Sequence, residues 1–397
     1  MKKVVILFGG WLEAPNGAAY VVNSLVKLKD LFKQNGIEIE SWTLDNTISR
    51  SFDEYKGGKT SVYKRFGLRI KSKLKSFISK RAKSSLLFAN IELFKGFRIA
   101  ELVGKSYAER ENEDRIVFVH DLFTCYYYLK NRKSRNKVFL VLHNNGDTYN
   151  MLLNYYPVLK GSKTLEKLKR LEDYVLKEVD LIGFVAKNPK KNFIKLHPEV
   201  DPGKVTFVYN GLNDIEFNED KHIHNPIEIC CVGSITYRKG QDIIVDALSS
   251  LSNDERSKLH ITFVGDGSMR EELENKANQS NLPITFVGYS KDPISYLQKS
   301  DIFILPSRDE GFPISILEAM REGLPVISTD IAGIPEMVFN DVNGLIINPN
   351  VDSLSKVLKN ISEYNWSKFA ENSRKLFQEK FTLSQTVVGY SYRLHSL

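Results

Sequence analysis

The feature that most constrains this chain is the stretch from Asp301 to Ile347, which has the pattern of a strand, a helix and a second strand. Residues 302–305 form a short apolar run, which is typical of a strand buried in a parallel sheet. Pro313 suits the first turn of a helix, because the amide hydrogens of that turn have no partner within the helix. Apolar residues then recur at helical spacing over 314–320, and residues 325–328 predict the next strand. Such a unit belongs in an open α/β sheet.

A ligand site is predicted where this strand ends, in the loop from Asp309 to Phe312 that opens the helix. Open parallel sheets bind ligands beyond the carboxyl ends of their strands, and a helix start attracts an anion, above all phosphate. Two carboxylates flank this spot: Glu310 in the loop and Glu318 in the helix, whose side chain leans back toward the helix start. A carboxylate beside a phosphate is useful only if it accepts hydrogen bonds from hydroxyls. Phosphate, ribose and sugar together indicate a nucleotide sugar.

Glu310 and Glu318 are separated by seven residues and lie in a longer run of motifs. The motifs are Glu310-Gly311-Phe312-Pro313, Leu317-Glu318-Ala319-Met320, Gly323-Leu324-Pro325-Val326-Ile327 and Gly333-Ile334-Pro335-Glu336. Here the sequence resembles the retaining glycosyltransferases of family 4, of the type that builds bacterial cell-envelope and capsule polysaccharides. The resemblance extends more loosely over the whole chain. It implies the GT-B fold, in which two Rossmann-like, doubly wound α/β domains face each other across a cleft.

The resemblance also implies roles for the residues of this stretch. Glu318 would hold the ribose of the donor and Glu310 its sugar. Gly311 and Phe312 would offer backbone N–H groups, with Pro313 completing the donor-binding segment. From the residues alone, the alternative is a solvated loop glutamate and a glutamate on a helix surface.

A second candidate site lies in the loop Gly233–Gly240, between a predicted strand at 227–232 and a predicted helix at 242–248. Arg238 and Lys239 could clamp a diphosphate, whose charge needs compensation when it leaves. The resembling family uses an Arg and a Lys in this loop, and Lys239 matches its Lys. The family's Arg usually follows the first glycine, where this chain has Ser234, so Arg238 is expected to supply that charge instead. The alternative is a pair of surface cations.

Two further loops are assigned through the resemblance. The loop after the predicted strand 284–287 lies against the nucleotide base in the family, which points to Tyr289 and Ser290 as base contacts. In the N-terminal loop that follows the strand 4–8, Gly17 matches a family glycine that faces the donor phosphates, while Asn16 replaces another glycine. A tight strand-to-helix turn is the alternative there.

Two histidines follow predicted strands of the first domain, at the ends that present ligand-binding residues. His120 follows the strand 116–119, and His143 follows the strand 138–142. The family places a histidine after such a strand, near the transferred sugar and the acceptor. His143 matches that position better, and His120 is the second choice.

The length of 397 residues suits two domains. We expect a first domain at 1–217, a linker, a nucleotide-sugar domain at 227–380, and a C-terminal helix at 381–397 that returns to the first domain. The three cysteines show no metal-ligand spacing, so they are expected to be reduced in a cytoplasmic protein. The N-terminal apolar run is too short for a signal peptide, and no stretch approaches the length of a membrane span.

The net charge of +8 allows nucleic acid, an anionic membrane or an anionic substrate as partner. Much of the positive charge lies in the segment 56–83, where Phe66, Ile70, Leu74 and Phe77 recur at helical spacing among lysines and arginines. That pattern predicts a basic amphipathic helix on an anionic membrane surface. A solvated basic face is the alternative. No nucleic-acid recognition motif accompanies these residues, so nucleic acid is not expected as a partner.

These features and the resemblance together predict a hexosyl- or N-acetylhexosaminyltransferase, peripheral on the inner face of the cell membrane. Retention of configuration is implied by the resemblance alone. The donor is expected to be a nucleoside-diphosphate sugar, UDP-linked by preference, and the acceptor a lipid-linked or cell-envelope glycan. No Asp-x-Asp motif is present, so neither a metal ion nor a cofactor is expected. Three alternatives remain: a nucleotide-sugar epimerase of the same fold, a phosphorylase, and a non-catalytic glycan-binding partner of another transferase. The sugar, the linkage and the oligomeric state are not determined by the sequence.

Overall fold

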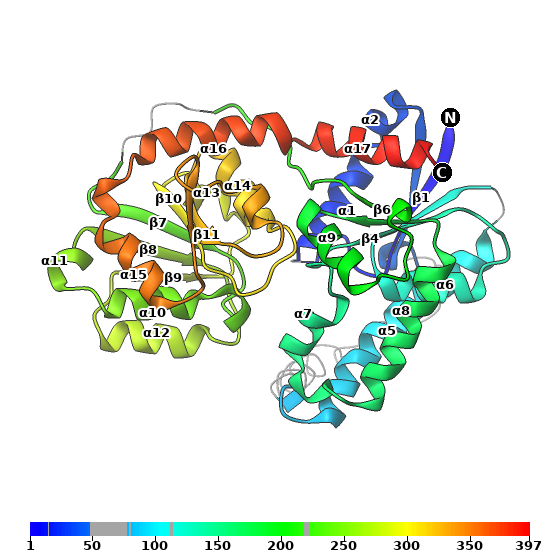
Figure 1. Ribbon diagram of the computed structural model, residues 1–397, viewed down its shortest axis with the longest axis horizontal. Coiled ribbons are helices and arrows are strands. Elements are labelled where there is room, and N and C mark those ends of the chain that lie inside the picture. The colour runs from blue at the N-terminus through cyan, green and yellow to red at the C-terminus, as the bar shows by residue number, and fades with distance from the viewer. Residues whose placement is uncertain (15, 48–77, 79–80, 112–113, 218–222) are drawn as a thin grey trace, which may run out of the picture. The chain divides into compact units, whose positions relative to one another are not determined.

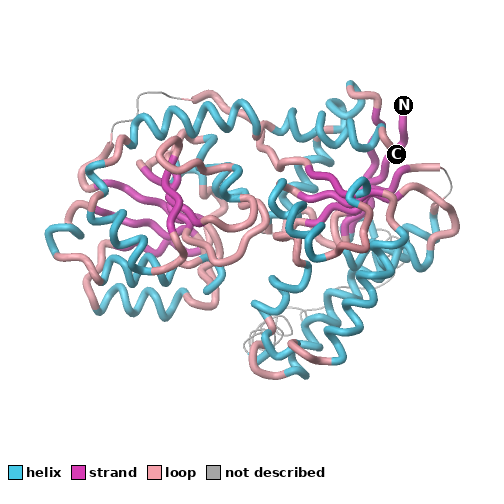
Figure 2. The backbone as a smooth tube through the Cα atoms, in the orientation of Figure 1, coloured by secondary structure: helices cyan, strands magenta, loops and turns pink. Residues whose placement is uncertain are grey.

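The computed structural model describes residues 1–14, 16–47, 78, 81–111, 114–217 and 223–397. The chain divides into two compact units. Unit 1 comprises Met1–Val185, Lys190–Val208 and Val387–Leu397, and unit 2 comprises Ala186–Pro189 and Tyr209–Thr386. Each unit is a parallel sheet with helices packed on both faces (Figures 1 and 2).

The sheet of unit 1 has six strands, and every neighbouring pair is parallel. The strands are β1 (Lys2–Phe8), β2 (Ile37–Thr43), β3 (Ile116–Val119), β4 (Val138–Leu142), β5 (Leu181–Phe184) and β6 (Val205–Phe207). Their order is β2-β1-β3-β4-β5-β6, so the chain changes its direction of travel across the sheet between β1 and β3. Such a switch point is where open α/β sheets bind ligands.

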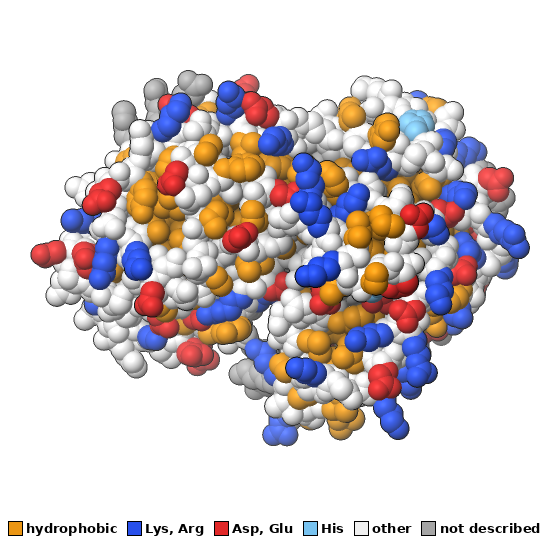
Figure 3. All heavy atoms as spheres, in the orientation of Figure 1, with side chains coloured by type: hydrophobic (Ala, Val, Ile, Leu, Met, Phe, Trp, Pro, Cys, Tyr) orange, Lys and Arg blue, Asp and Glu red, His pale blue; other side chains and the backbone are white. Residues whose placement is uncertain are grey.

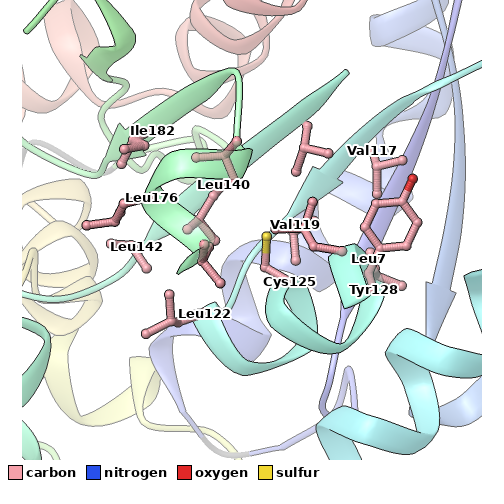
Figure 4. Packing of buried hydrophobic residues seen from close by; sticks show 14 of the residues in the cluster. Leu7, Val117, Val119, Leu122, Cys125, Tyr128, Leu140, Leu142, Leu176 and Ile182 are labelled. Carbon is pink, nitrogen blue, oxygen red and sulfur yellow. The ribbon is translucent and has the colours of Figure 1, made fainter. Parts of the chain in front are cut away.

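The helices of unit 1 cover a sheet that is buried on both faces. They are α1 (Gly17–Lys27), α2 (Lys29–Gln34), α5 (Leu86–Arg110), α6 (Leu122–Asn131), α7 (Thr148–Tyr155), α8 (Lys163–Glu178) and α9 (Lys187–Leu196), with short 3-10 turns at Pro157–Leu159 and Pro202–Lys204. Figure 4 shows the core between β1, β3, β4, β5 and helices α6 and α8, where Val119, Cys125 and Leu140 pack together. Because both faces are buried, the central strands are continuous apolar runs.

The sheet of unit 2 repeats this plan with six parallel strands. They are β7 (Ile227–Val232), β8 (Leu259–Val264), β9 (Ile284–Gly288), β10 (Ile302–Leu305), β11 (Val326–Thr329) and β12 (Gly344–Ile347). The order is β12-β11-β10-β7-β8-β9, which places the switch point between β7 and β10. Every residue of β10 and of β11 is buried.

The helices of unit 2 alternate with its strands along the chain. They are α10 (Gln241–Ser249), α11 (Asn253–Arg256), α12 (Arg270–Gln279), α13 (Ile294–Leu297), α14 (Ile314–Arg321), α15 (Val351–Lys359) and α16 (Trp366–Lys380), with 3-10 turns at Tyr237–Lys239, Ile334–Glu336 and Ile361–Glu363. The last helix, α17 (Leu383–His395), carries the chain from unit 2 into unit 1.

The predicted α/β class with two doubly wound sheets is confirmed, and the central stretch folds as β10, α14 and β11. One detail differs: Pro313 is the N-cap of α14 and not a residue of its first turn, because its ψ of 118° is extended. Residues 56–77 and 79–80 of the predicted basic helix lie outside the described residues. None of the helices described is long and apolar enough to cross a membrane.

Candidate functional site

The candidate site of unit 2 lies at the carboxyl end of its sheet, at the switch point between β7 and β10. The loop after β7 contains Arg238 and Lys239, and the loop after β10 contains Glu310. Since β7 and β10 are hydrogen-bonded neighbours, residues about seventy positions apart in the chain meet here. In the sequence the two loops are separate candidates, and the tertiary structure brings them together.

A buried carboxylate held by two cations forms the centre of this site. Lys239 Nζ lies 2.5 Å from Glu310 Oε1, and Arg238 Nη1 lies 3.2 Å from Glu310 Oε2. The Ser307 hydroxyl donates a third hydrogen bond to Oε1, at 3.0 Å. The Glu310 side chain is 6% exposed and that of Lys239 is 11% exposed. The two cations therefore converge on one point and are not a pair of surface charges.

The pKa of Glu310 reflects this pairing. Burial alone would raise the pKa of its carboxyl, but Lys239 and Arg238 outweigh burial and hold the pKa below its ordinary value. The carboxylate is therefore ionised at neutral pH. It balances two positive charges that a diphosphate would also attract.

Arg308, which the sequence analysis did not select, fixes the loop that carries the two cations. Its guanidinium makes two hydrogen bonds to the Asp242 carboxylate, at 2.8 and 2.7 Å, and lies 3.9 Å from the centre of the Tyr237 ring. Its backbone N–H donates to the carbonyl of Arg238 at 2.8 Å. Gly240 completes the turn with φ of 77°, and a Cβ there would lie 2.0 Å from the Pro306 carbonyl oxygen. In sequence, Arg308 looked like an ordinary loop cation.

The start of α14 is positioned by the packing of Phe312, which lies in the loop just before the helix. Phe312 is buried, and its ring stacks on Tyr209 with centroids 5.5 Å apart. The backbone carbonyl of Gly311 accepts a hydrogen bond from Gly333 N–H at 2.9 Å. Pro313 caps α14 without a side-chain hydrogen bond. The Phe312 side chain therefore holds the loop in place, which leaves backbone groups to meet a ligand at the helix start.

Glu318, one turn into α14, lies in a different electrostatic environment from that of Glu310. Burial raises the pKa of its carboxyl to about 7, and within the described residues no hydrogen bond reaches it. Arg321, whose charge lowers that pKa, forms its ion pair with Glu322 instead. Keeping a carboxylate in such surroundings costs stability, and perturbed groups of this kind cluster at functional sites. A donor of hydrogen bonds, such as a diol, would relieve the cost.

The proposed base contacts lie beyond β9, on the same edge of the sheet. Tyr289 is 66% exposed, and the Ser290 hydroxyl accepts a hydrogen bond from Asp292 N–H at 3.1 Å. Ser234, which stands where the family has Arg, is exposed, and its backbone carbonyl accepts a hydrogen bond from Gln241. Arg238 is therefore the guanidinium that reaches Glu310 in this unit.

In unit 1, the small-residue loop leads into α1. Gly17 is its first residue, and the side chain of Asn16 caps the helix by accepting a hydrogen bond from Ala19 N–H at 2.9 Å. Asn16, which replaces a family glycine, thus has a structural function of its own. Gly17 remains exposed at the carboxyl end of the sheet.

The two histidines of unit 1, which the sequence analysis treated as alternatives, are in direct contact. Nδ1 of His120 and Nε2 of His143 are 3.1 Å apart, and the ring centroids are 5.4 Å apart. Burial lowers the pKa of the His143 ring to about 4. Burial, and then the charge on His143, lower the pKa of the His120 ring well below its ordinary value. Both rings are therefore neutral at pH 7.

Among the described side chains, no three or more His, Cys, Asp or Glu residues gather in a way that could hold a metal ion. The polar groups at the end of the unit 2 sheet are instead a cation pair, two carboxylates and a helix start. Together these groups could bind an anion that carries hydroxyl groups.

Residues 213–377 match the family model described as glycosyl transferases group 1. Among curated relatives, an uncharacterized glycosyltransferase of Methanocaldococcus jannaschii, MJ1178, is 31% identical over 189 residues, which cover 46% of this chain and 51% of the relative. The O-antigen biosynthesis glycosyltransferase WclY of Escherichia coli is 27% identical over 198 residues, 47% of this chain and 54% of the relative. The chain thus spans about half the length of these relatives.

Similar solved structures include Anabaena Alr3699/HepE in complex with UDP, with a TM-score of 0.67 and 16% identity, covering 100% of both chains. A variant of S. aureus TarM, in complex with fondaparinux, alpha-GlcNAc-glycerol and UDP, has a TM-score of 0.71 and 13% identity, also covering 100% of both chains. These neighbours confirm the predicted fold, GT-B. The UDP belongs to those structures.

Proposed function

We propose that this protein is a retaining glycosyltransferase that moves a sugar from a UDP-linked donor to a glycan acceptor. The observation that carries the proposal is the buried Glu310 held between Lys239 and Arg238 at the start of α14. The glycosyl transferases group 1 match over 213–377, the polysaccharide-biosynthesis relatives and the UDP complexes of similar structures support it. An O-antigen, capsule or other cell-envelope glycan is the class of acceptor that fits those relatives.

The negative charges of the donor diphosphate can be balanced by the Arg238 and Lys239 cations. When a nucleoside diphosphate binds, its phosphates compete with Glu310 for the Arg238 and Lys239 cations. Glu310 then has acceptor capacity for the hydroxyls of the sugar, and Glu318 accepts hydrogen bonds from the ribose. As the bond between the sugar C1 and the diphosphate breaks, the two cations stabilise the negative charge that develops on the leaving group.

Retention of configuration is the stereochemistry that the resemblance implies. The acceptor oxygen bonds to C1 on the face from which the diphosphate departs, and the acceptor proton passes to an oxygen of the leaving diphosphate. We propose that the clamp of Arg238 and Lys239 makes a metal ion unnecessary. A hexose or an N-acetylhexosamine is the proposed class of transferred sugar.

A donor screen tests the function. Thermal shifts with UDP, GDP, ADP and their common sugars should single out the UDP series, and the sugar with the largest shift should then release UDP in the presence of lipid-linked glycan. Product analysis by NMR distinguishes transfer, with the α or β linkage read directly, from epimerisation of the donor. A donor whose sugar is epimerised without transfer, or a protein stabilised by glycans and by no nucleotide, would contradict the proposal.

The raised pKa of Glu318 predicts opposite effects on stability and on binding. Its carboxyl shifts from an ordinary pKa of 4.5 to about 7 in the folded protein. The folded state therefore binds more protons between those values, and the free energy of unfolding falls as pH rises from about 4.5 to 7. Glu318→Gln should raise Tm at pH 8, where the wild-type carboxylate is charged and buried. The same variant should weaken UDP binding, because a ribose diol donates to a carboxylate better than to an amide.

Calorimetry with UDP across pH 6 to 8 checks this prediction. Wild-type affinity should rise with pH as Glu318 ionises, and Glu318→Gln should lose most of that dependence. Glu371→Gln, an exposed glutamate of the same unit, is the matched control. If Glu318→Gln loses stability at pH 8, or binds UDP as the wild type does, the assignment of Glu318 to the ribose is wrong.

We also propose that the enzyme is peripheral on the inner face of the cell membrane. The basic segment 56–83 supports this on its composition. A second support lies on α5, where Leu87, Phe94 and Leu102 are 65%, 62% and 48% exposed at a spacing of about two helical turns. The Arg98 guanidinium lies 5.9 Å from the centre of the Phe94 ring. Figure 3 shows hydrophobic side chains beside Lys and Arg over this part of unit 1.

Flotation with phosphatidylglycerol vesicles measures the membrane contact. Four charge reversals in the basic segment should release the protein, because each basic residue near an anionic surface contributes about 1 kcal/mol. They are Lys71→Glu, Lys73→Glu, Lys75→Glu and Lys80→Glu. Wild-type binding should also weaken near roughly 0.5 M salt, where the screening length falls to about 4 Å.

The matched control reverses four exposed lysines of unit 2, on α15 and α16. They are Lys356, Lys359, Lys368 and Lys375. This control carries the same change of net charge and should keep vesicle binding. Equal release by both variants would show that only net charge matters, and a wild type that ignores anionic vesicles at low salt would end the membrane proposal.

A further inference from the structure

We propose that His120 is a positioning residue for His143: its hydrogen bond holds Nε2 of the His143 ring and thereby fixes the orientation in which the other ring nitrogen, Nδ1, meets a ligand. The inference rests on the proposed function, since it assigns a partner to a residue of that site.

The fold itself brings the two rings together. β3 and β4 are parallel neighbours with Val119 opposite Leu140, and each strand is followed by one of the histidines. The backbone N–H of His120 donates to the Leu7 carbonyl at 3.1 Å, which anchors this residue to β1 as well. His120 thus follows β3, is hydrogen-bonded to β1, and contacts the residue that follows β4. Its Nδ1 lies 3.1 Å from Nε2 of His143, at the switch point of the unit 1 sheet.

His120 is too enclosed to contact a substrate itself. It is 2% exposed, and its ring lies 4.4 Å from that of Phe118 and 6.3 Å from that of Tyr390, measured between centroids. Its Nε2 is buried and makes no hydrogen bond within the described part of the chain. His143 is only partly buried and is the member of the pair that a ligand can reach.

The hydrogen bond between the two imidazole rings restricts both of them. Two neutral imidazoles share one proton in an N–H···N hydrogen bond, so one ring donates and the other accepts. Whichever donates, Nε2 of His143 is occupied, and Nδ1 carries the opposite protonation state. The bond therefore fixes the rotation of the His143 ring and links the protonation state of Nδ1 to the direction of the hydrogen bond, which is the role that a hydrogen-bonded neighbour has for functional histidines.

Two substitutions at one position separate this role from simple packing. His120→Asn keeps an amide nitrogen or oxygen near the place of Nδ1, which can donate or accept. His120→Leu fills the apolar surroundings without a hydrogen bond. The Leu variant should lower kcat for transfer by roughly ten- to a hundredfold, the scale of misplacing a reacting group. The Asn variant should recover most of that loss, and both should bind UDP as the wild type does.

A double-mutant cycle then asks whether His120 acts through His143. If it does, His120→Leu combined with His143→Ala should be no slower than His143→Ala alone. Losses that multiply would overturn the proposal, and so would a folded His120→Leu variant with wild-type kcat. A loss of UDP affinity in His120→Leu would also overturn it, by assigning the residue to folding.

NMR of ¹⁵N-labelled histidine gives a readout that does not need activity. The His143 signals, identified by their absence in His143→Ala, should shift in His120→Leu and stay close to wild type in His120→Asn. Signals unmoved by His120→Leu would refute the positioning role. If the wild type transfers no sugar, the proposed function fails. The spectrum still decides whether His120 positions the His143 ring.

Discussion

Glu310→Gln should reduce sugar transfer by at least about a hundredfold while leaving UDP binding intact or tighter. The loss follows from the proposed contact of this carboxylate with the reacting sugar, because removing such a charged group is expected to cost about a hundredfold in rate. The gain in binding follows from the ion pairs: Lys239 and Arg238 are both held by this carboxylate, and the neutral amide releases them for the phosphates. Transfer kinetics and calorimetry with UDP measure the two effects separately.

The same variant should be less stable in the absence of nucleotide. Removing one partner of a buried ion pair leaves uncompensated charge, which typically costs about 3 kcal/mol. UDP supplies the missing negative charge, so it should raise the Tm of Glu310→Gln by more than it raises that of the wild type. Glu371→Gln serves as control. Near-normal transfer by a folded Glu310→Gln, or a parallel loss of UDP affinity, would contradict the assignment of Glu310 to the sugar.

Lys239→Ala should show the complementary pattern, with transfer and UDP binding both impaired. A buried ammonium that meets a developing anion contributes on the order of a hundredfold to the rate. Uridine, which has no phosphate, should bind the variant as it binds the wild type. Arg238→Ala should behave in the same way, since its guanidinium reaches the same carboxylate. Steady-state kinetics and calorimetry with UDP and uridine measure these differences.

The control for Lys239→Ala is Lys276→Ala, which removes an exposed lysine of the same unit that pairs with Asp246. It should leave both transfer and binding unchanged. Under the proposed mechanism, EDTA should not reduce the activity of the wild-type protein, because the two cations would supply the positive charge for the leaving group. Activity that EDTA abolishes and manganese restores would show that this clamp does not act alone.

The pairing with Glu310 explains how unit 2 keeps two largely buried cations side by side when no anion is bound. Two buried cations without a counterion would repel each other and lose hydration. Glu310 neutralises them, and a diphosphate can take its place as a partner. Glu318 has no such arrangement in the described residues, which is why the pKa of one carboxyl falls and that of the other rises to about 7.

The sequence alone determined the class of fold and the strand ends at which ligand-binding residues are expected. Short apolar runs such as 302–305, closed by Pro306 and Ser307, are typical of strands buried on both faces of a parallel sheet, and the residues after such strands lie at one edge of that sheet. The resemblance to the retaining glycosyltransferases of family 4 then selected Glu310, Lys239 and His143 among the residues at those strand ends. Neither step needs knowledge of which strands are neighbours.

Only the tertiary structure decided which of these residues touch. Strand order is set by long-range packing, so the meeting of Lys239 with Glu310 depends on β7 lying beside β10, and that of His120 with His143 on β3 lying beside β4. Arg308 was missed for the same reason, because its partners become visible only when the two loops meet. A sequence states the charge of a side chain. Its pKa, its burial and the identity of its partner are properties of the packed environment that distant segments create.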